Sequence, residues 1–139
     1  GAGGVVPSII LGLEKLGTPE ITLTNRTQEN VESLKKTFKN IKSIKWGETI
    51  DFDVIINATS IGLKNDENFI IDYSDGKSGK FFYDVIYNPR KTKFLEKAEK
   101  KGNKIENGKM MFIYQAHQSF TLWHNIMPKI DNETIELLD

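Results

Sequence analysis

The chain opens on GAGG, a stretch whose residue types could bind the phosphates of a dinucleotide. A dinucleotide-binding turn needs three small residues: one for the tight turn, one that lets the backbone reach the pyrophosphate, and one for close packing of helix on strand. Gly1 and Gly3 occupy the first two places, but Val6 stands in the third, where Gly or Ala is usual. The match is partial, so a tight loop without a ligand is an equally good interpretation of this turn taken alone.

A second candidate phosphate contact lies at Asn25, Arg26 and Thr27, directly after the first predicted strand. Proteins that bind NAD usually carry Asp or Glu about 20 residues after the glycine turn, where it accepts a hydrogen bond from the ribose 2′-hydroxyl. No acid stands at this place, and Arg26 offers instead a planar fork that suits a phosphate. We therefore predict that the chain binds NADP through its 2′-phosphate. The alternative for Arg26 alone is a solvated surface residue.

The rest of the composition argues against several classes of protein. There is no cysteine, so the chain has no disulfide and no thiolate chemistry. His117 and His124 lie further apart in the sequence than a metal-binding pair prefers, and no acidic third ligand is near them. The 19 basic and 19 acidic residues cancel, which argues against nucleic acid and anionic membranes as partners. No apolar run approaches the roughly 20 residues of a membrane helix, and no signal peptide is visible. We expect a cytoplasmic protein without a metal.

Strands and helices alternate along the chain at short spacing. We predict strands at 20–24, 41–46, 53–59, 80–87 and 103–106, helices at 4–16, 27–38, 92–101, 109–124 and 132–138, and a surface loop over 64–79. This alternation is typical of right-handed βαβ units, and the continuous apolar run DVIINAT indicates a strand that is covered on both faces. The predicted fold class is α/β, a Rossmann-like, doubly wound and mainly parallel sheet in one domain, 1–139.

The predicted helices have recognisable starts and inner faces. In the first helix, Ile9, Leu13 and Leu16 fall on one apolar stripe, which we expect to face the core. Thr27 and Thr92 stand where the second and third helices begin, and each is a plausible N-cap.

Polar residues follow the carboxyl ends of two buried strands, which is where open α/β sheets bind ligands. Thr59 and Ser60 come after one strand, and Tyr87 ends the next, so its hydroxyl could reach the same crevice. Gln115 lies in the middle of a helix among apolar neighbours, where an amide needs a hydrogen-bond partner. From the residues alone, Tyr87 is interpreted equally well as a packing residue, and Gln115 as a surface residue.

Five separated stretches together resemble the shikimate dehydrogenase family, in order and at familiar spacing. They are GAGG, NRT, NATSIG, YDVIYNPRKTKFLEKAEKKG and NGKMMFIYQAHQSFTLWH, which extend over essentially the whole chain. The resemblance implies an enzyme that reduces 3-dehydroshikimate to shikimate with NADPH, in the biosynthesis of aromatic amino acids. Members of the family have an N-terminal domain that holds most of the shikimate site and a C-terminal Rossmann-like domain that holds NADP. This chain resembles only the second.

The resemblance implies site residues at positions that match the family's motifs. The implied cofactor contacts are Gly1, Ala2, Gly3, Gly4, Asn25, Arg26, Thr27, Asn57, Thr59, Ser60, Val85, Gly108 and Met111. The implied substrate contacts are Tyr87 and Gln115. Asn30 departs from the family, which often has a basic residue at this position, and this leaves Arg26 as the main cation beside the 2′-phosphate.

The resemblance also implies which groups lie outside this chain. In this family a lysine and an aspartate of the N-terminal domain bind the substrate hydroxyls and carry the proton transfer. Neither position is found here, so we expect no catalytic residue in this chain and no reduction of 3-dehydroshikimate by the chain alone. Two alternatives stay open: a fragment of a quinate/shikimate dehydrogenase, and a non-catalytic nucleotide-binding module that kept the cofactor fold.

The Rossmann strand order, 3-2-1-4-5-6, puts the first strand at the centre of the sheet, and that strand should lie immediately before Gly1. Without it, the strands at 20–24 and 53–58 lose their shared neighbour and expose unpaired backbone groups. The two strands could pair directly, another chain could donate a strand, or the polypeptide could be longer than the printed residues. We expect self-association through exposed strand edges, or rearrangement, rather than a monomer with an unchanged sheet.

Overall fold

The computed structural model describes residues 1–64 and 78–138 and has an α/β architecture. Its strands are β1 (Ile21–Leu23), β2 (Ile41–Ser43), β3 (Val54–Asn57), β4 (Phe81–Asp84) and β5 (Lys104–Glu106). Its helices are α1 (Val6–Lys15), α2 (Gln28–Thr37), α3 (Lys93–Lys100), α4 (Lys109–His124) and α5 (Asn132–Glu136). The loop expected at 64–79 falls, apart from its ends, outside the described residues.

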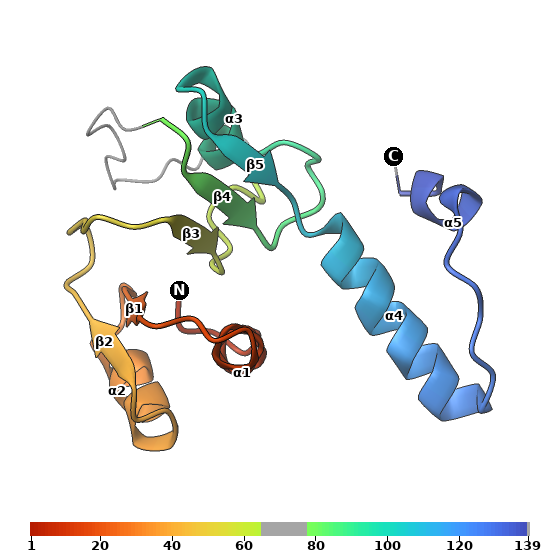
Figure 1. Ribbon diagram of the computed structural model, residues 1–139, viewed down its shortest axis with the longest axis horizontal. Coiled ribbons are helices and arrows are strands. Elements are labelled where there is room, and N and C mark those ends of the chain that lie inside the picture. Colours follow the sequence, from red (N-terminus) through yellow and green to blue (C-terminus); the bar gives the residue numbers. More distant parts are fainter. Residues whose placement is uncertain (65–77, 139) are drawn as a thin grey trace.

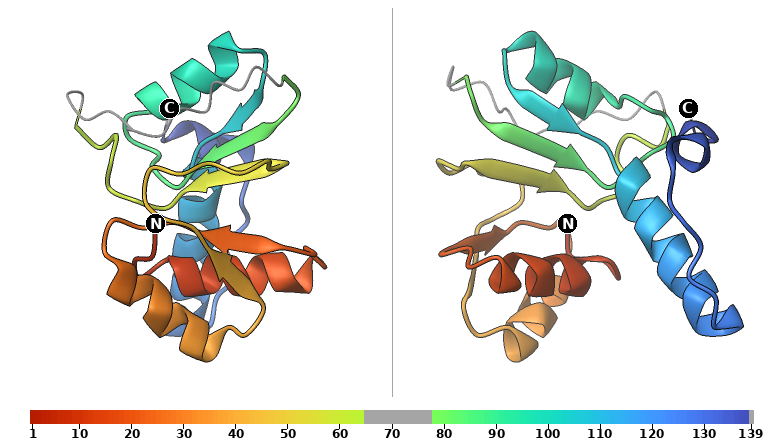
Figure 2. Two further views of the ribbon diagram at one scale, coloured as in Figure 1. Left: turned by 90° about the vertical axis from the view of Figure 1, so that its left-hand side faces the viewer. Right: turned by 45° about the vertical axis from the view of Figure 1, so that its right-hand side comes forward.

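All strand pairs in the described part of the chain are parallel, which confirms the predicted βαβ pattern. The strands form two separate sheets, β1–β2 and β3–β4–β5. Figures 1 and 2 show α1 and α2 beside the first sheet and α3 against the second. Strands β1 and β3 share no ladder within these residues, so the alternative in which they pair directly is wrong here.

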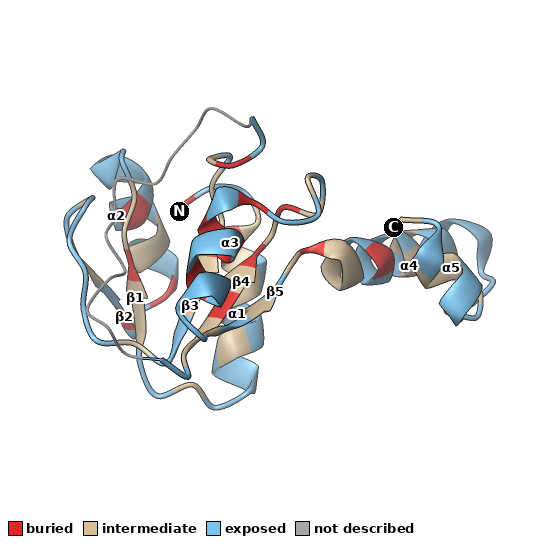
Figure 3. Ribbon diagram, turned by 90° about the horizontal axis from the view of Figure 1, so that it is seen from above, coloured by how far each residue is buried: buried red, intermediate tan, exposed pale blue. Residues whose placement is uncertain are grey.

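Each sheet has an apolar core of its own, formed with the helices that pack beside it (Figure 3). The core of the first sheet joins α1, β1, α2 and β2 and consists of Ala2, Val6, Ile10, Leu23, Val31, Phe38 and Ile41. The core of the second joins β4 to α3 and consists of Phe82, Phe94, Leu95 and Ala98. In β4 and α3, aromatic side chains contribute to this core, since the rings of Phe82 and Phe94 lie 5.4 Å apart.

The apolar stripe of α1 is buried over its first turns only. Val6 and Ile10 are buried, Ile9 and Leu13 are half-buried, and Leu16 is 83% exposed. The expectation that Leu16 faces the core is therefore wrong. Leu16 is the C-cap residue, beyond the turns around Val6 and Ile10 that contact the first core, so no packed surface lies beneath its side chain.

Helix α4 spans the predicted residues and leads away from the two sheets, and α5 lies beside it (Figures 1 and 3). It buries only Ile113 among its own residues. Large apolar side chains of α4 and of the segment after it are exposed, namely Phe112, Tyr114, Phe120, Leu122, Trp123, Ile126, Met127 and Leu137. Within residues 1–64 and 78–138, no helix has the length and apolar character needed to cross a membrane.

Candidate functional site

The glycine turn begins between the ends of β1 and β3. The Gly1 ammonium donates to the Thr24 carbonyl oxygen at 2.8 Å, and a Cβ at Gly1 would lie 2.5 Å from the Ala58 carbonyl oxygen. Only glycine fits such a close approach of two backbones.

Beyond Gly1 the turn opens to solvent. Gly3 and Gly4 are exposed, and a Cβ at either position would meet no protein atom within 4 Å. The N-cap residue of α1, Val5, makes no side-chain capping bond, so no side chain covers the positive end of the helix. Exposed backbone at a helix N-terminus, in open space, is suited to bind a phosphate.

Val6 occupies the third position of the turn, where the dinucleotide motif usually has Gly or Ala. Its side chain is 3% exposed and belongs to the core between α1, β1 and α2. The larger residue is accommodated because it faces this core rather than the open side of the turn.

The loop after β1 carries the predicted 2′-phosphate contacts. Thr27 is the N-cap residue of α2, as predicted, although its side chain makes no capping hydrogen bond. The Asn25 side-chain amide donates to the Thr27 carbonyl oxygen at 2.8 Å and holds the loop. Arg26 is exposed, and no ion pair is present for it within the described residues. Because Thr24 binds Gly1, this loop lies beside the glycine turn.

The loop after β3 is held by Asn57, which is 3% exposed. Its amide nitrogen donates to the Ile61 carbonyl oxygen at 3.1 Å and to Asp84 Oδ1 at 3.0 Å. Its amide oxygen accepts from the Thr59 backbone N–H at 3.0 Å and the Thr59 hydroxyl at 2.8 Å. Both donors and both lone pairs are therefore used within the protein, and Asn57 acts here as the organiser of the loop.

Two further predicted residues follow in this loop. The Thr59 hydroxyl also accepts from the Ile61 backbone N–H at 3.1 Å, which completes a small local network. Ser60 is exposed, and its hydroxyl makes no hydrogen bond among the described residues. Of Thr59 and Ser60, Ser60 has the hydroxyl that is exposed and can contact a ligand.

Asp84 is a buried positioning residue that the sequence analysis missed. Its carboxylate is fully buried at the end of β4 and accepts from Asn57, from the Ile86 backbone N–H at 3.0 Å and from the Thr92 hydroxyl at 2.6 Å. Burial raises the pKa of Asp84, and these three hydrogen bonds oppose the rise. An acid inside the apolar segment KFFYDVIY was the signal for this role.

The Asp84 network also explains where β4 ends. The strand was predicted over 80–87 but stops at Asp84. The Asp84 side chain takes the Ile86 backbone N–H, which then has no part in a strand ladder. The same network joins β3 and β4 to α3, because Thr92 is the N-cap of α3 and accepts from the Leu95 N–H at 3.4 Å, as its predicted capping role requires.

Val85 and Gly108, both predicted near the cofactor, lie against each other. The Gly108 backbone N–H donates to the Ile86 carbonyl oxygen at 3.2 Å, and a Cβ at Gly108 would overlap the Val85 carbonyl group. Gly108 therefore permits α4 to begin directly beside the end of β4.

Of the two predicted substrate residues, Tyr87 packs against the start of α4 and Gln115 lies on the surface of that helix. Tyr87 stacks on Phe112 with ring centres 4.6 Å apart. Met111 is half-buried and Gln115 is exposed, one turn further along the helix. Of the two interpretations left open for Gln115, the structure agrees with the surface residue, because α4 leaves the sheets and exposes this face.

The histidines have local roles in the structure. The His117 Nε2 atom is 2.8 Å from the Pro128 carbonyl oxygen, and the His124 ring lies 4.4 Å from the ring of Phe120. In the part of the chain that the structure describes, no group of three His, Cys, Asp or Glu side chains could hold a metal ion.

Comparisons with known proteins agree with this geometry. No family model matches the chain. A shikimate dehydrogenase (NADP(+)) from Pelagibacter ubique (strain HTCC1062) is 58% identical over 139 residues, which are 100% of this chain and 52% of that protein. Another from Caldicellulosiruptor saccharolyticus is 42% identical over 146 residues and covers 99% of this chain.

The fold comparison gives the same result. The crystal structure of shikimate dehydrogenase from Aquifex aeolicus aligns with a TM-score of 0.84 and 31% identity, over 99% of this chain and 50% of that one. A shikimate dehydrogenase in complex with NADP+ aligns with a TM-score of 0.81 and 30% identity, over 99% of this chain and 51% of that one. The chain spans about half the length of the curated relatives it matches, and within that half it belongs to the shikimate dehydrogenase family.

Proposed function

We propose that the chain is the NADP-binding part of a shikimate dehydrogenase. One observation carries the proposal: the hydrogen bond between Gly1 and Thr24 brings an open glycine turn at the start of α1 beside the loop that carries the exposed Arg26. The turn is suited to the pyrophosphate, and Arg26 is suited to the 2′-phosphate that distinguishes NADP from NAD. The printed names of the relatives, which specify NADP(+), support the same cofactor.

We further propose that the two sheets are the halves of one doubly wound, Rossmann-like sheet. Read across the molecule, the strands follow the order β2, β1, a gap, β3, β4, β5. This is the order 3-2-1-4-5-6 without its central strand. In such a sheet the dinucleotide lies at the carboxyl ends of the strands, where the glycine turn, Ser60 and the start of α4 are found.

The nicotinamide and the substrate belong, in this proposal, at the start of α4. Gly108, Met111 and Gln115 share one face of this helix, with spacings of three and four residues. Tyr87 lies next to that face through its stacking on Phe112. The substrate class is that of the relatives, shikimate and 3-dehydroshikimate, and the Gln115 amide and Tyr87 hydroxyl suit its hydroxyl groups.

Titration of the chain with NADP+ and NAD+ by calorimetry tests the cofactor. We expect tighter binding of NADP+. Arg26→Ala should weaken NADP+ binding by about 2 kcal/mol, the size of one or two charge-assisted hydrogen bonds, and should leave NAD+ binding nearly unchanged. Equal losses for both cofactors would contradict the 2′-phosphate assignment.

Lys39→Ala is the matched control. It also removes one exposed positive charge, but Lys39 follows the far end of α2, a ten-residue helix that begins directly after Thr27. It should change neither affinity by more than a few tenths of a kcal/mol. We also expect that the 139-residue chain binds NADPH without reducing 3-dehydroshikimate, which an absorbance assay at 340 nm follows. Substantial turnover by the purified chain would overturn that expectation.

A further inference from the structure

Strand β5 has an asparagine at each end, and the two side chains hydrogen-bond in the same way. Asn103 directly precedes the strand, and Asn107 directly follows it. In each, the side-chain oxygen accepts from a backbone N–H, and the side-chain nitrogen donates to a backbone carbonyl oxygen. The two residues therefore differ in the elements that they join and not in the kind of bond that they make.

Asn103 joins elements at the amino end of the sheet. Its Oδ1 atom accepts from the Lys80 backbone N–H at 3.0 Å, and its Nδ2 atom donates to the Ala98 carbonyl oxygen at 3.2 Å. Lys80 directly precedes β4, and Ala98 lies in α3. Open α/β sheets bind their ligands at the opposite end, beyond the carboxyl ends of the strands.

Asn107 joins elements at the carboxyl end of the sheet. Its Oδ1 atom accepts from the backbone N–H of Lys109, the first residue of α4, at 3.0 Å. Its Nδ2 atom donates at 2.8 Å to the carbonyl oxygen of Arg90, which lies in the loop between β4 and α3. The first bond satisfies an N–H group that a helix leaves unpaired at its start, and the second ties that start to the loop after β4.

Two further contacts join the start of α4 to the same loop. The Gly108 backbone N–H donates to the Ile86 carbonyl oxygen, and Phe112 stacks on Tyr87. From there α4 leads away from the sheets, and Ile113 is the one buried residue within the helix (Figure 1). The position of the proposed nicotinamide and substrate residues of α4 therefore depends on how its first turns are fixed to the loop after β4.

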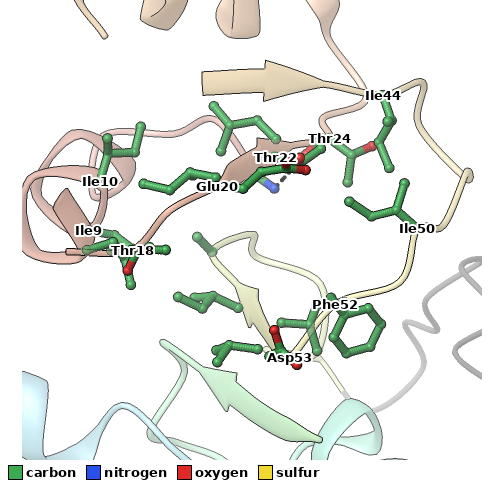
Figure 4. Close-up of a pocket in the computed structure, with 18 of the residues that line it drawn as sticks. Ile9, Ile10, Thr18, Glu20, Thr22, Thr24, Ile44, Ile50, Phe52 and Asp53 are labelled. Carbon is green, nitrogen blue, oxygen red and sulfur yellow. Dashed lines mark hydrogen bonds between the residues drawn. The ribbon is translucent and has the colours of Figure 1, made fainter. Parts of the chain in front are cut away.

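These contacts lie on the β5 side of the second sheet. The opposite edge, β3, borders a groove between β1 and β3, which α1 and the connection from β2 to β3 line with apolar side chains such as Ile10, Ile44 and Phe52 (Figure 4). Strand β4 separates β5 from β3. The contacts of Asn107 are therefore independent of that groove.

We propose that Asn107 is a positioning residue for the nicotinamide end of the cofactor, a role that rests on the NADP site proposed above. Its two hydrogen bonds fix the first turn of α4 against the loop after β4, and this turn brings Gly108 and Met111 to the nicotinamide. Asn107 acts through these two residues rather than by a contact of its own. The adenosine end of the cofactor belongs to the loop that carries Arg26, after β1, and does not depend on Asn107.

The test compares Asn107→Ala with Asn103→Ala in the 139-residue chain. Each substitution removes one accepted and one donated hydrogen bond, so we expect similar falls in the midpoint of thermal unfolding. Two ligands separate the ends of the site: NADPH carries both ends, and adenosine 2′,5′-bisphosphate carries only the adenosine end. Asn107→Ala should weaken NADPH binding about tenfold and adenosine 2′,5′-bisphosphate binding less than about twofold, and Asn103→Ala should change each less than about twofold.

The fluorescence of bound NADPH is a second readout, because it arises in the nicotinamide ring. At saturating NADPH, the unsubstituted chain and Asn103→Ala should show the same change in emission on binding, and Asn107→Ala should show a smaller one. Asn107→Ser keeps an oxygen that can accept from the Lys109 N–H, so it should restore part of the affinity and of the emission change. A merely structural role of Asn107 would lower stability and leave the emission of the bound ring unchanged.

Three results would overturn the proposal: equal losses of NADPH affinity in the two alanine variants, equal weakening of both ligands by Asn107→Ala, or no loss of NADPH affinity in that variant. If Asn107→Ala does not fold, Asn107→Ser and Asn103→Ser make the same comparison. An unsubstituted chain that binds neither ligand would refute the proposed NADP site and this proposal with it. Binding that Arg26→Ala weakens and Asn107→Ala does not would refute the role of Asn107 alone.

Discussion

The carboxyl ends of β1 and of β3 and β4 form two regions of the candidate site, and they use their polar groups in opposite ways. At β3 and β4, the side chains of Asn57, Asp84 and Thr92 bind one another and nearby backbone, and all three are buried. At β1, Arg26 and the glycine turn face open space. The first region is a frame whose polar groups bind one another, and the second has exposed polar groups that are open to a ligand.

This contrast separates the roles of residues that looked alike in the sequence. Asn57 ends one strand, Arg26 lies shortly after another, and both can form several hydrogen bonds. The Asn57 amide is saturated by its own loop, whereas the Arg26 guanidinium is exposed. The cofactor role of Asn57 stays a prediction. In that role Asn57 would shape the loop that contacts the cofactor, because its own amide is already saturated.

The largest expected effect comes from breaking the frame with Asp84→Ala. The substitution leaves the Ile86 N–H and the Thr92 hydroxyl buried without their acceptor and removes one acceptor of the Asn57 amide. We expect a loss of about 4 kcal/mol in the free energy of unfolding, measured by urea denaturation.

Asp53→Ala is the matched control for Asp84→Ala. Asp53 carries an exposed carboxylate 3.7 Å from Lys80 Nζ, and its removal should cost less than about 0.5 kcal/mol. Similar losses for the two variants would show that burial of the Asp84 network contributes little.

The second effect compares two glycines. A Cβ at Gly108 would overlap the Val85 carbonyl group, so Gly108→Ala should cost about 2 kcal/mol through overpacking. Gly3→Ala meets no protein atom within 4 Å, so it should change stability by less than about 0.5 kcal/mol but should weaken NADP+ binding. Thermal unfolding and cofactor titration of both variants separate the two roles. A stability loss at Gly3 as large as that at Gly108 would contradict the contrast.

Most elements of the fold could be predicted because their signals are local. The helix at 109–124 has the predicted bounds, and Thr27 and Thr92 stand at the predicted N-caps. Strand ends were predicted less well: the strand expected at 80–87 stops at Asp84, because the Asp84 side chain accepts from the Ile86 backbone N–H. Periodicity cannot reveal such a competition, since it depends on which groups lie nearby in space.

The candidate site divides in the same way. The types of residue at Gly1, Gly3 and Arg26 indicated phosphate binding, and the structure brings the loop that carries Arg26 beside Gly1. The exposure of Gln115 was left open by the sequence, and the central position of Asp84 was not foreseen. Both depend on how far each element lies from the cores, which the pattern along a single helix or strand does not encode.

By itself, the amino-acid sequence determined the order of strands and helices, the family, and the side chains that can bind phosphate, because propensity, periodicity and motif spacing act over a few residues. Only the tertiary structure decided that β1 and β3 remain apart with a groove between them, and that the polar ends of β3 and β4 are saturated while the glycine turn is open. The reason is that backbone pairing, burial and hydrogen-bond saturation are set by neighbours in space, between segments far apart along the chain.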